Sequence, residues 1–361
     1  MDLKSLCDQI AQLTALEAPS GFEEPVLSAA RDALRSCCER TEVDVRGNVY
    51  GYQSGDESDA PLVMITAHAD EIGFLITSVL EGGYLRFTKL GGATDMVLPG
   101  QRVHVLSGTG PLVGVIGVKP GHVLKSDAEA RRVPDLNDMY IDVGAASKED
   151  VVEWGIEPGT PVTFVGELTP TRNPRRWFGK SVDNRMGVVS VLEAARRLNG
   201  QPVAASRAFV IVVEEEVGLR GAAVASAHVQ PDVVLAIDTV PAGGTPDLRP
   251  DDLPWEIGKG PLLKVRETKG LSTHGPLREL IRSIAAENQI PLQLIVDTAG
   301  ITDATSAQQA SGQIAAAVIG LARRYSHSAV EMFDATDVAA IIELVCLTTE
   351  HLKDRSVLLR L

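Results

Sequence analysis

The chain has 361 residues, of which 44% are hydrophobic, and a formal net charge of −14. A chain of this length is too long for one compact core and favours two unequal domains. The acidic balance argues against nucleic acid and anionic membrane as partners, because phosphate contacts need clustered lysine and arginine. No apolar run reaches the roughly 20 residues of a membrane span, so we expect no transmembrane helix.

The beginning of the chain lacks an apolar h-region and a small-residue cleavage site, so it does not resemble a secretory signal. The four cysteines show no CxxC spacing, and Cys37 and Cys38 are adjacent. This usage indicates reduced thiols rather than disulfides or a zinc site. We therefore expect a cytoplasmic protein.

In chain order, residues 3–16 and 22–38 are predicted to be helices, separated by a Pro-Ser-Gly turn signal. Residues 61–67 form an almost continuous apolar run, which is typical of a strand buried on both faces. Between 73 and 165, short β-rich runs alternate with Gly, Pro and Asp clusters, which predicts a small barrel or sandwich. Its one helical signal is 147–154, with a capping-box-like start.

After Gly166 the alternation of helices and strands returns. The predicted helices are 186–198, 276–288 and a last helix from Thr336–Asp337 to about 352, and the predicted strands are 207–213, 233–237, 293–296 and 314–319. We therefore predict an α/β domain made of residues 1–72 and 166–361, interrupted by a β-rich insert over 73–165.

His68 and Asp70 directly follow the apolar run 61–67. Sites in α/β folds form at the carboxyl ends of strands, and residues two apart in an extended segment point the same way. Asp70 is therefore able to approach His68 or an ion that His68 binds, and a carboxylate on the far imidazole nitrogen is usual for a metal-binding histidine. The alternative is a strand-end histidine bonded to a neighbour.

Glu214, Glu215 and Glu216 follow a second apolar run. Three successive carboxylates repel one another and gain nothing from packing, although a solvated loop is the alternative. Near a cation, adjacent carboxylates are able to divide the work, one binding the metal while its neighbour accepts a proton from water.

Three further residues complete the pattern. Asp238 follows the apolar strand 233–237, Asp183 precedes a helix and could be only its N-cap, and His327 lies in a polar loop after 314–319. Together the chain supplies two histidines and at least three carboxylates at the ends of apolar segments. A two-metal site needs such a mixed set of ligands.

Six separated segments carry a more specific signal: AHADEIGF (67–74), KSVDNRMGV (180–188), VEEEVGLRGA (213–222), AIDT (236–239), GKGP (258–261) and RRYSHSAVE (323–331). In this order they resemble the M42 family of metallo-aminopeptidases, which includes the tetrahedral (TET) aminopeptidases, glutamyl aminopeptidases and proteins once labelled endoglucanases. The resemblance covers nearly the whole chain.

The resemblance implies two divalent metal ions, zinc(II) or cobalt(II), held by five side chains. Asp183 would bridge the two ions. His68 and Asp238 would complete the shell of one ion, and Glu216 and His327 that of the other. All five positions carry a suitable ligand here.

By the same resemblance, Glu215 is the general base and Asp70 belongs to the catalytic set as the residue that orients His68. The predicted function is hydrolysis of the N-terminal residue of short peptides with a free N-terminus. One alternative is a two-metal deacylase of N-acyl amino acids. Another is a glycoside hydrolase, which needs paired carboxylates ~5–9.5 Å apart and no metal. A non-catalytic assembly protein would have lost ligands.

The resemblance also implies a mixed-sheet peptidase domain flanked by helices, with the insert as a small, PDZ-like β-barrel for dimerisation. We expect a homo-oligomer, a dimer that builds to a tetrahedral dodecamer. One departure from the family pattern is Ile301, which stands where a glycine is usual in the stretch 298–304. It affects the expected side-chain preference and none of the expected ligands.

Overall fold

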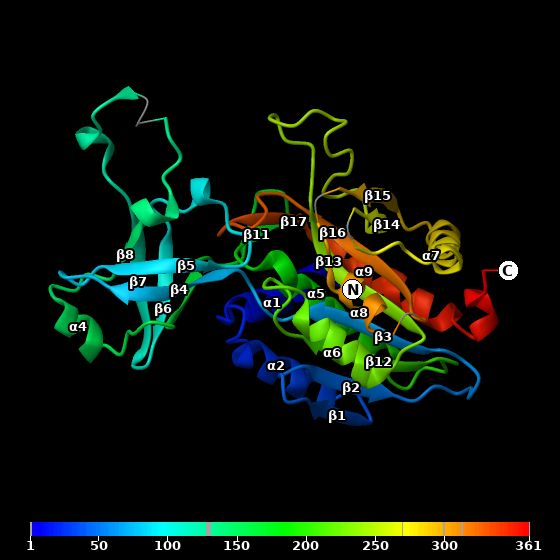
Figure 1. The fold of residues 1–361 in the computed structure, drawn as a ribbon. Coiled ribbons are helices and arrows are strands. Elements are labelled where there is room, and N and C mark those ends of the chain that lie inside the picture. The colour runs from blue at the N-terminus through cyan, green and yellow to red at the C-terminus, as the bar shows by residue number, and fades with distance from the viewer. Residues whose placement is uncertain (1, 128–130, 269, 299, 312, 361) are drawn as a thin grey trace.

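The computed structural model describes residues 2–127, 131–268, 270–298, 300–311 and 313–360. Figure 1 shows a large body built on one sheet and a smaller barrel that projects from its side. The mixed α/β class and the small β-barrel are both confirmed. Among the described residues, no helix is at once long and apolar enough to cross a membrane.

The large sheet has eight strands in the order β1-β2-β12-β3-β13-β16-β14-β15. Its four central strands are parallel and lie in the order β12, β3, β13, β16. By contrast, β1, β2 and β14 join through antiparallel pairs. The strands are β1 (Arg40–Val43), β2 (Val49–Gln53), β3 (Leu62–His68), β12 (Ser206–Val212), β13 (Val233–Pro241), β14 (Leu262–Glu267), β15 (Gln293–Asp297) and β16 (Ala315–Arg323).

Helices cover both faces of this sheet, so its central strands are buried on both sides (Figure 1). In β3, Val63 and Ile65 point into one core and Met64 into the other, as the alternation of a strand requires. The first core is covered by α1 (Leu3–Thr14), α2 (Glu24–Arg35), α5 (Val182–Leu198), α7 (Gly275–Glu287) and α9 (Ala335–His351). The second core is covered by α6 (Arg220–Val229) and α8 (Asp303–Ser311).

The barrel closes in the strand order β4-β5-β8-β7-β6-β9 and has a core of its own. Phe74 lies edge-on to Phe87 and Phe164, with ring centroids 5.2 and 5.3 Å away. The helix α4 (Lys148–Glu153) has the predicted capping box, formed by Ser147 and Asp150. The barrel strands are β4 (Gly73–Val79), β5 (Leu85–Leu90), β6 (Arg102–Ser107), β7 (Gly110–Gly117), β8 (Tyr140–Asp142) and β9 (Pro161–Phe164).

Several elements differ from the predictions. The last helix begins at Ala335 with Asp334 as its N-cap, so the predicted start at Thr336–Asp337 is one to two residues too late. The strand β13 continues to Pro241, which places Asp238 inside it rather than after it. Among the described residues, the α-helices and β-strands that were not predicted are β1, β2, β8, β14, α6, α8 and the small sheet β10 (Thr169–Pro170), β11 (Arg176–Gly179) and β17 (Glu331–Asp334).

Candidate metal centre and active site

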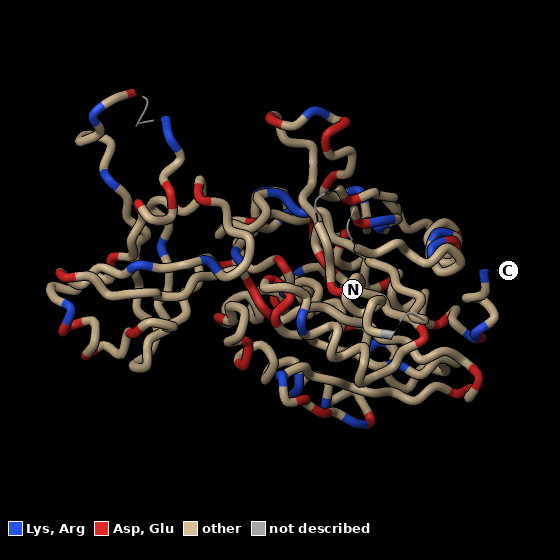
Figure 2. The backbone as a smooth tube through the Cα atoms, viewed as in Figure 1, with Lys and Arg blue, Asp and Glu red and all other residues tan. Residues whose placement is uncertain are grey.

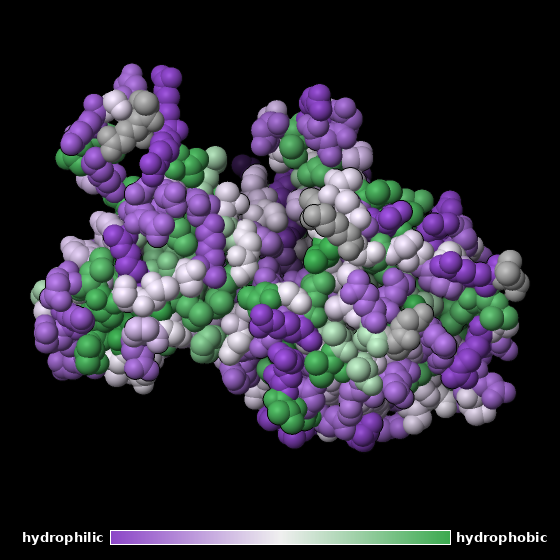
Figure 3. All heavy atoms as spheres, viewed as in Figure 1, coloured by the Kyte–Doolittle hydropathy of each residue, from purple (hydrophilic) through white to green (hydrophobic). Residues whose placement is uncertain are grey.

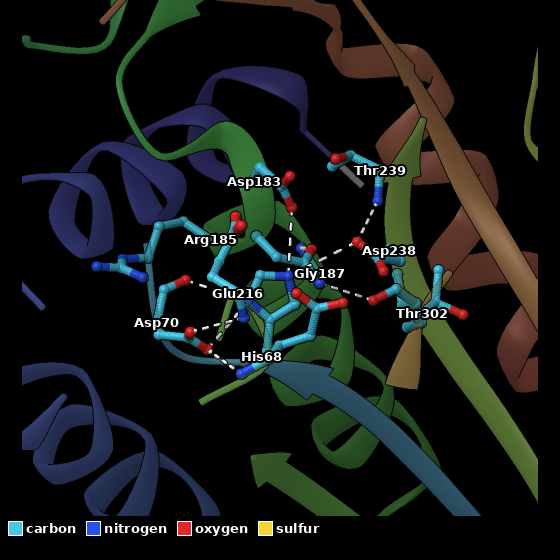
Figure 4. Close-up of polar contacts among 12 residues, drawn as sticks. His68, Asp70, Asp183, Arg185, Gly187, Glu216, Asp238, Thr239 and Thr302 are labelled. Atoms are coloured by element: carbon cyan, nitrogen blue, oxygen red, sulfur yellow. Dashed lines mark hydrogen bonds and ion pairs between the residues drawn. The ribbon is translucent and has the colours of Figure 1, made fainter. Parts of the chain in front are cut away.

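The polar residues singled out from the sequence meet at one edge of the sheet. His68 is the last residue of β3, and Glu216 lies in the loop that follows β12. Asp238 lies in β13, and His327 lies in the loop after β16. Because these four strands are parallel neighbours, their carboxyl ends share one edge. Asp183, from the start of α5, reaches the same place (Figure 4).

Two groups of side chains have the spacing that a metal ion needs, and Asp183 belongs to both. In the first, His68 Nε2 lies 3.3 Å from Asp183 Oδ1 and 3.7 Å from Asp238 Oδ1. In the second, His327 Nε2 lies 3.4 Å from Asp183 Oδ2 and 3.5 Å from Glu216 Oε1. Each oxygen of Asp183 therefore faces one group.

This donor set fits divalent cations. Imidazole and carboxylate together suit zinc and similar ions. Moreover, Asp183 Oδ1 is buried and has no hydrogen-bond partner among the described residues. A buried carboxylate oxygen without a hydrogen bond is costly, and a cation between Asp183 Oδ1 and His68 Nε2 would remove that cost.

Asp70 lies where a carboxylate can fix the orientation of His68. Its Oδ1 is 3.3 Å from His68 Nδ1, and its backbone oxygen is 3.1 Å from the same nitrogen (Figure 4). The carboxylate also accepts the backbone N–H groups of Glu215 and Glu216, each at 3.0 Å, and the hydroxyl of Ser20 at 2.6 Å. Asp70 thus connects the imidazole to the acidic loop, a link that the sequence pattern did not predict.

The alternative that Asp183 is only a helix N-cap is wrong. The regular part of α5 begins after a kink at Asp183 and Asn184, whose backbone torsions are not helical. The capping side chain there is Asn184, whose Oδ1 accepts the N–H of Gly187 at 3.0 Å. Its N–H donates to Glu331 Oε2 at 3.0 Å, and Glu331 Oε1 accepts the N–H of His327 at 2.8 Å. Glu331, which was not predicted as a site residue, therefore holds two members of the second group.

A second buried network fixes the segment before α5. Glu71 is 2% exposed and accepts from Lys180 Nζ at 2.7 and 2.9 Å. It also accepts from Arg185 at 3.2 Å and from the hydroxyl of Ser181. These contacts hold the turn that presents Asp183 to both groups.

Each carboxylate of the acidic triplet has a different environment. Glu214 points outward and pairs with Arg46 at 2.6 Å and Arg220 at 3.6 Å. Glu216 belongs to the second group, whereas Glu215 lines the adjacent cavity without a salt bridge to any described residue. The solvated-loop interpretation therefore describes Glu214 alone.

The crowding of acids at this edge shifts several pKa values. Burial, and then the charge of Asp183, raises the pKa of Glu216 to about 8. Burial also raises the pKa of Glu215 well above its usual value, and the charge of Asp238 adds to this. Burial alone would lower the pKa of His327. The hydrogen bond from His327 to Asp183 and the charge of Glu216 outweigh burial and raise this pKa to about 9. A cation would relieve this repulsion.

A cavity of about 630 Å³ opens beside the two groups. Its lining includes Asp183, Glu215 and His327. It also includes the apolar side chains of Leu219, Val240, Leu253, Trp255 and Ile301. Such a pocket suits a side chain placed next to the reacting groups. Within the stretch 298–304, Ala299 lies outside the described residues.

Comparison with known proteins identifies relatives along most of the chain. The family model described as M42 glutamyl aminopeptidase matches residues 47–344. A lysyl aminopeptidase of Pyrococcus furiosus is 34% identical over 94% of this chain and 95% of its own.

Solved structures agree over almost the whole chain. A TET aminopeptidase from a marine sediment Thaumarchaeota archaeon has a TM-score of 0.94 and 32% identity, covering 99% of both chains. The TET1 peptidase of Pyrococcus horikoshii, which can assemble into a tetrahedron or a large octahedral shell, has a TM-score of 0.84 and 30% identity over 96% of this chain and 99% of its own. The chain therefore belongs to the M42 glutamyl aminopeptidase family.

Proposed function

We propose that this protein is a metal-dependent aminopeptidase that removes the N-terminal residue of short peptides, with two divalent metal ions and Glu215 as general base. The observation that carries this proposal is the position of Asp183, whose two oxygens face two separate His/carboxylate groups. In this proposal His68, Asp183 and Asp238 hold one ion, and Asp183, Glu216 and His327 hold the other. Zinc(II) or cobalt(II) suits these ligands.

When bound, two such cations supply Lewis acidity that lowers the pKa of water to ~7 and stabilises the charge developing on the peptide oxygen. Glu215 accepts a proton from the attacking water as its oxygen bonds to the carbonyl carbon. The same carboxyl then donates that proton to the amine nitrogen as the C–N bond breaks.

Asp70 supports this reaction without touching the substrate. It keeps His68 in one orientation through Nδ1, so that Nε2 faces the first group. Through the N–H groups of Glu215 and Glu216 it also fixes the loop that carries the base. We therefore assign Asp70 as a positioning residue.

The test is hydrolysis of a panel of aminoacyl-p-nitroanilides and their N-acetylated forms. Each substrate is measured with EDTA-treated protein and again after zinc(II) or cobalt(II) is returned. We expect cleavage of the free-amine substrates alone, lost with EDTA and restored by metal. Cleavage of only the acetylated forms would instead identify a deacylase. Hydrolysis of a β-glucan that persists in EDTA would identify a glycoside hydrolase.

We further propose that residues 1–72 and 166–361 form the catalytic domain and that 73–165 form an inserted, PDZ-like dimerisation domain. The closed barrel over 73–164 with its separate core supports this division. Its strand β7 presents Pro111, Val113 and Val115 outward in alternation, and all three are exposed. Figure 3 shows hydrophobic side chains on the surface of the barrel.

An assembly of dimers into a tetrahedral dodecamer is our proposal for the whole molecule, supported by the assemblies named for the P. horikoshii relative. We propose a cytoplasmic location, supported by the four free thiols. A hollow assembly would admit short peptides more readily than folded proteins.

A further inference from the structure

Arg323 is a buried cation inside the candidate metal centre. It is the last residue of β16 and is only 2% exposed. All three guanidinium nitrogens have partners: Nε donates to Thr239 Oγ1 at 2.5 Å, Nη1 pairs with Glu331 Oε1, and Nη2 pairs with Asp183 Oδ2. This fork fixes the position of the guanidinium beside Asp183.

The contact with Arg323 makes the two oxygens of Asp183 unequal. Oδ1, which faces His68, has no hydrogen-bond partner among the described residues. Oδ2, which faces His327, is shared with the guanidinium. The second group therefore has a competing cation on its shared ligand, and the first group does not.

We propose that Arg323 makes the two cation sites unequal, so that the site of Asp183, Glu216 and His327 binds its ion more weakly than the site of His68, Asp183 and Asp238. This inference rests on the proposed two-cation function. In it, Arg323 is a positioning residue that competes with the second ion for Asp183 Oδ2.

Elementary electrostatics supports this asymmetry. Arginine stays protonated in proteins, so its charge cannot be removed when a metal ion arrives. The guanidinium is shielded from water, which leaves its repulsion of a second cation only weakly screened. Glu331 offsets part of this charge, but its carboxylate is also committed to the N–H groups of Asp183 and His327.

The experiment is calorimetric titration of metal-stripped protein with zinc(II) and, separately, cobalt(II), with bound metal counted by elemental analysis. Wild-type protein is expected to bind one ion tightly and a second at least ~10-fold more weakly. His68→Ala should remove the tight step, and His327→Ala should remove the weak one. Arg323→Met should tighten the second step by ~10-fold or more while the first changes less.

Two variants guard against trivial outcomes. In Arg323→Met, the buried carboxylate of Glu331 loses its charged partner, which could destabilise the fold. The double variant Arg323→Met/Glu331→Gln removes both buried charges and therefore tests the same prediction without an unpaired carboxylate. Arg324→Met is the matched control, because the guanidinium of Arg324 donates to the backbone oxygen of Gly244 at 3.1 Å and contacts neither group. It should leave both binding steps unchanged.

The outcomes separate this inference from the proposed function. If both Arg323 variants bind the first ion but leave the ratio of the two dissociation constants within twofold of wild type, Arg323 does not set the asymmetry. If wild-type protein binds both ions equally tightly, the inference is also wrong, while the two-cation function stands. If wild-type protein binds no zinc(II) or cobalt(II), the proposed function itself fails.

Discussion

Glu215 differs from its two neighbours in having neither a salt bridge to a described residue nor a place in a metal-binding group. Its side chain faces the cavity, and burial raises its pKa. Glu215→Gln keeps the shape but cannot accept a proton, so kcat should fall by ~10²–10⁴-fold. Because Glu215 is not an expected ligand, the number of bound metal ions should stay at the wild-type value. Steady-state kinetics and elemental analysis measure both.

Glu214→Gln is the matched control for this prediction. The Glu214 carboxylate pairs with Arg46 and Arg220 away from the cavity, and surface pairs of this kind contribute little. Its kcat should stay within about twofold of wild type. Near-wild-type kcat in Glu215→Gln, or a loss in Glu214→Gln as large as that in Glu215→Gln, would mean that the base is assigned to the wrong carboxylate.

We expect Ile301 to influence which N-terminal side chain of the substrate the enzyme prefers. It is 48% exposed and lines the cavity together with Leu253 and Trp255. Ile301→Ala widens the cavity, so kcat/KM for a phenylalanyl substrate should rise ~10-fold relative to an alanyl substrate. Val296→Ala, an exposed residue of β15 outside the cavity, serves as control. An unchanged ratio in Ile301→Ala would show that the substrate side chain does not reach this wall.

At the scale of elements, the start of α2 is tied to the acidic loop by one buried carboxylate. Glu23, the N-cap residue of α2, is 5% exposed. Its Oε1 accepts the N–H of Gly21 at 2.8 Å and that of Glu214 at 3.1 Å. Burial, with a contribution from Asp70, raises the pKa of Glu23 to about 7. The folded protein therefore holds a proton here that the unfolded chain loses near its normal pKa of 4.5.

This raised pKa predicts a pH dependence of stability. The contribution of protonated Glu23 is fully present below pH 4.5 and is lost as the pH rises through about 7. In Glu23→Gln the amide oxygen can replace Oε1 in both hydrogen bonds. Between pH 5 and pH 8, the free energy of unfolding of this variant should therefore fall by ~1–3 kcal/mol less than that of wild type. Denaturant unfolding at the two pH values measures this. Glu24→Gln, at an exposed position, should behave like wild type, and equal pH slopes in all three proteins would contradict the prediction.

Elements with strong local signals could be predicted from the sequence, and those without them could not. β3 is an almost continuous apolar run, and α4 has a complete capping box, so both were found. By contrast, α8 has little amphipathic character, and β8 has only three residues. Their structure depends on the α6 and β7 neighbours that the fold supplies.

The candidate site divides in the same way. His68 and Asp238 could be singled out because each comes at or near the end of an apolar strand. The pairing of Arg323 with Asp183 spans 140 residues and joins the end of β16 to the start of α5. No local pattern carries that information, and Arg323 appeared in the sequence only as part of a motif.

At the scale of the whole molecule, charged residues of both signs are spread over the barrel and the large body (Figure 2). The outward strip of Pro111, Val113 and Val115 on β7 is uncharged and apolar, which is unusual for an exposed strand. A second barrel that packs on this strip would remove its apolar surface from water, and no charged side chain of the strip would have to be buried.

If the barrel mediates assembly, charges placed on this strip should disrupt it. Wild-type protein is expected near 460 kDa by light scattering, because twelve chains of 38.4 kDa give that mass. Val113→Lys/Val115→Lys should shift the mass to smaller species, since lysines buried against a partner are costly. Its circular dichroism should remain that of wild type, because both side chains point away from the barrel core. Val45→Lys, at a fully exposed position between β1 and β2, should keep the wild-type mass, and an equal mass for the β7 variant would place the interface elsewhere.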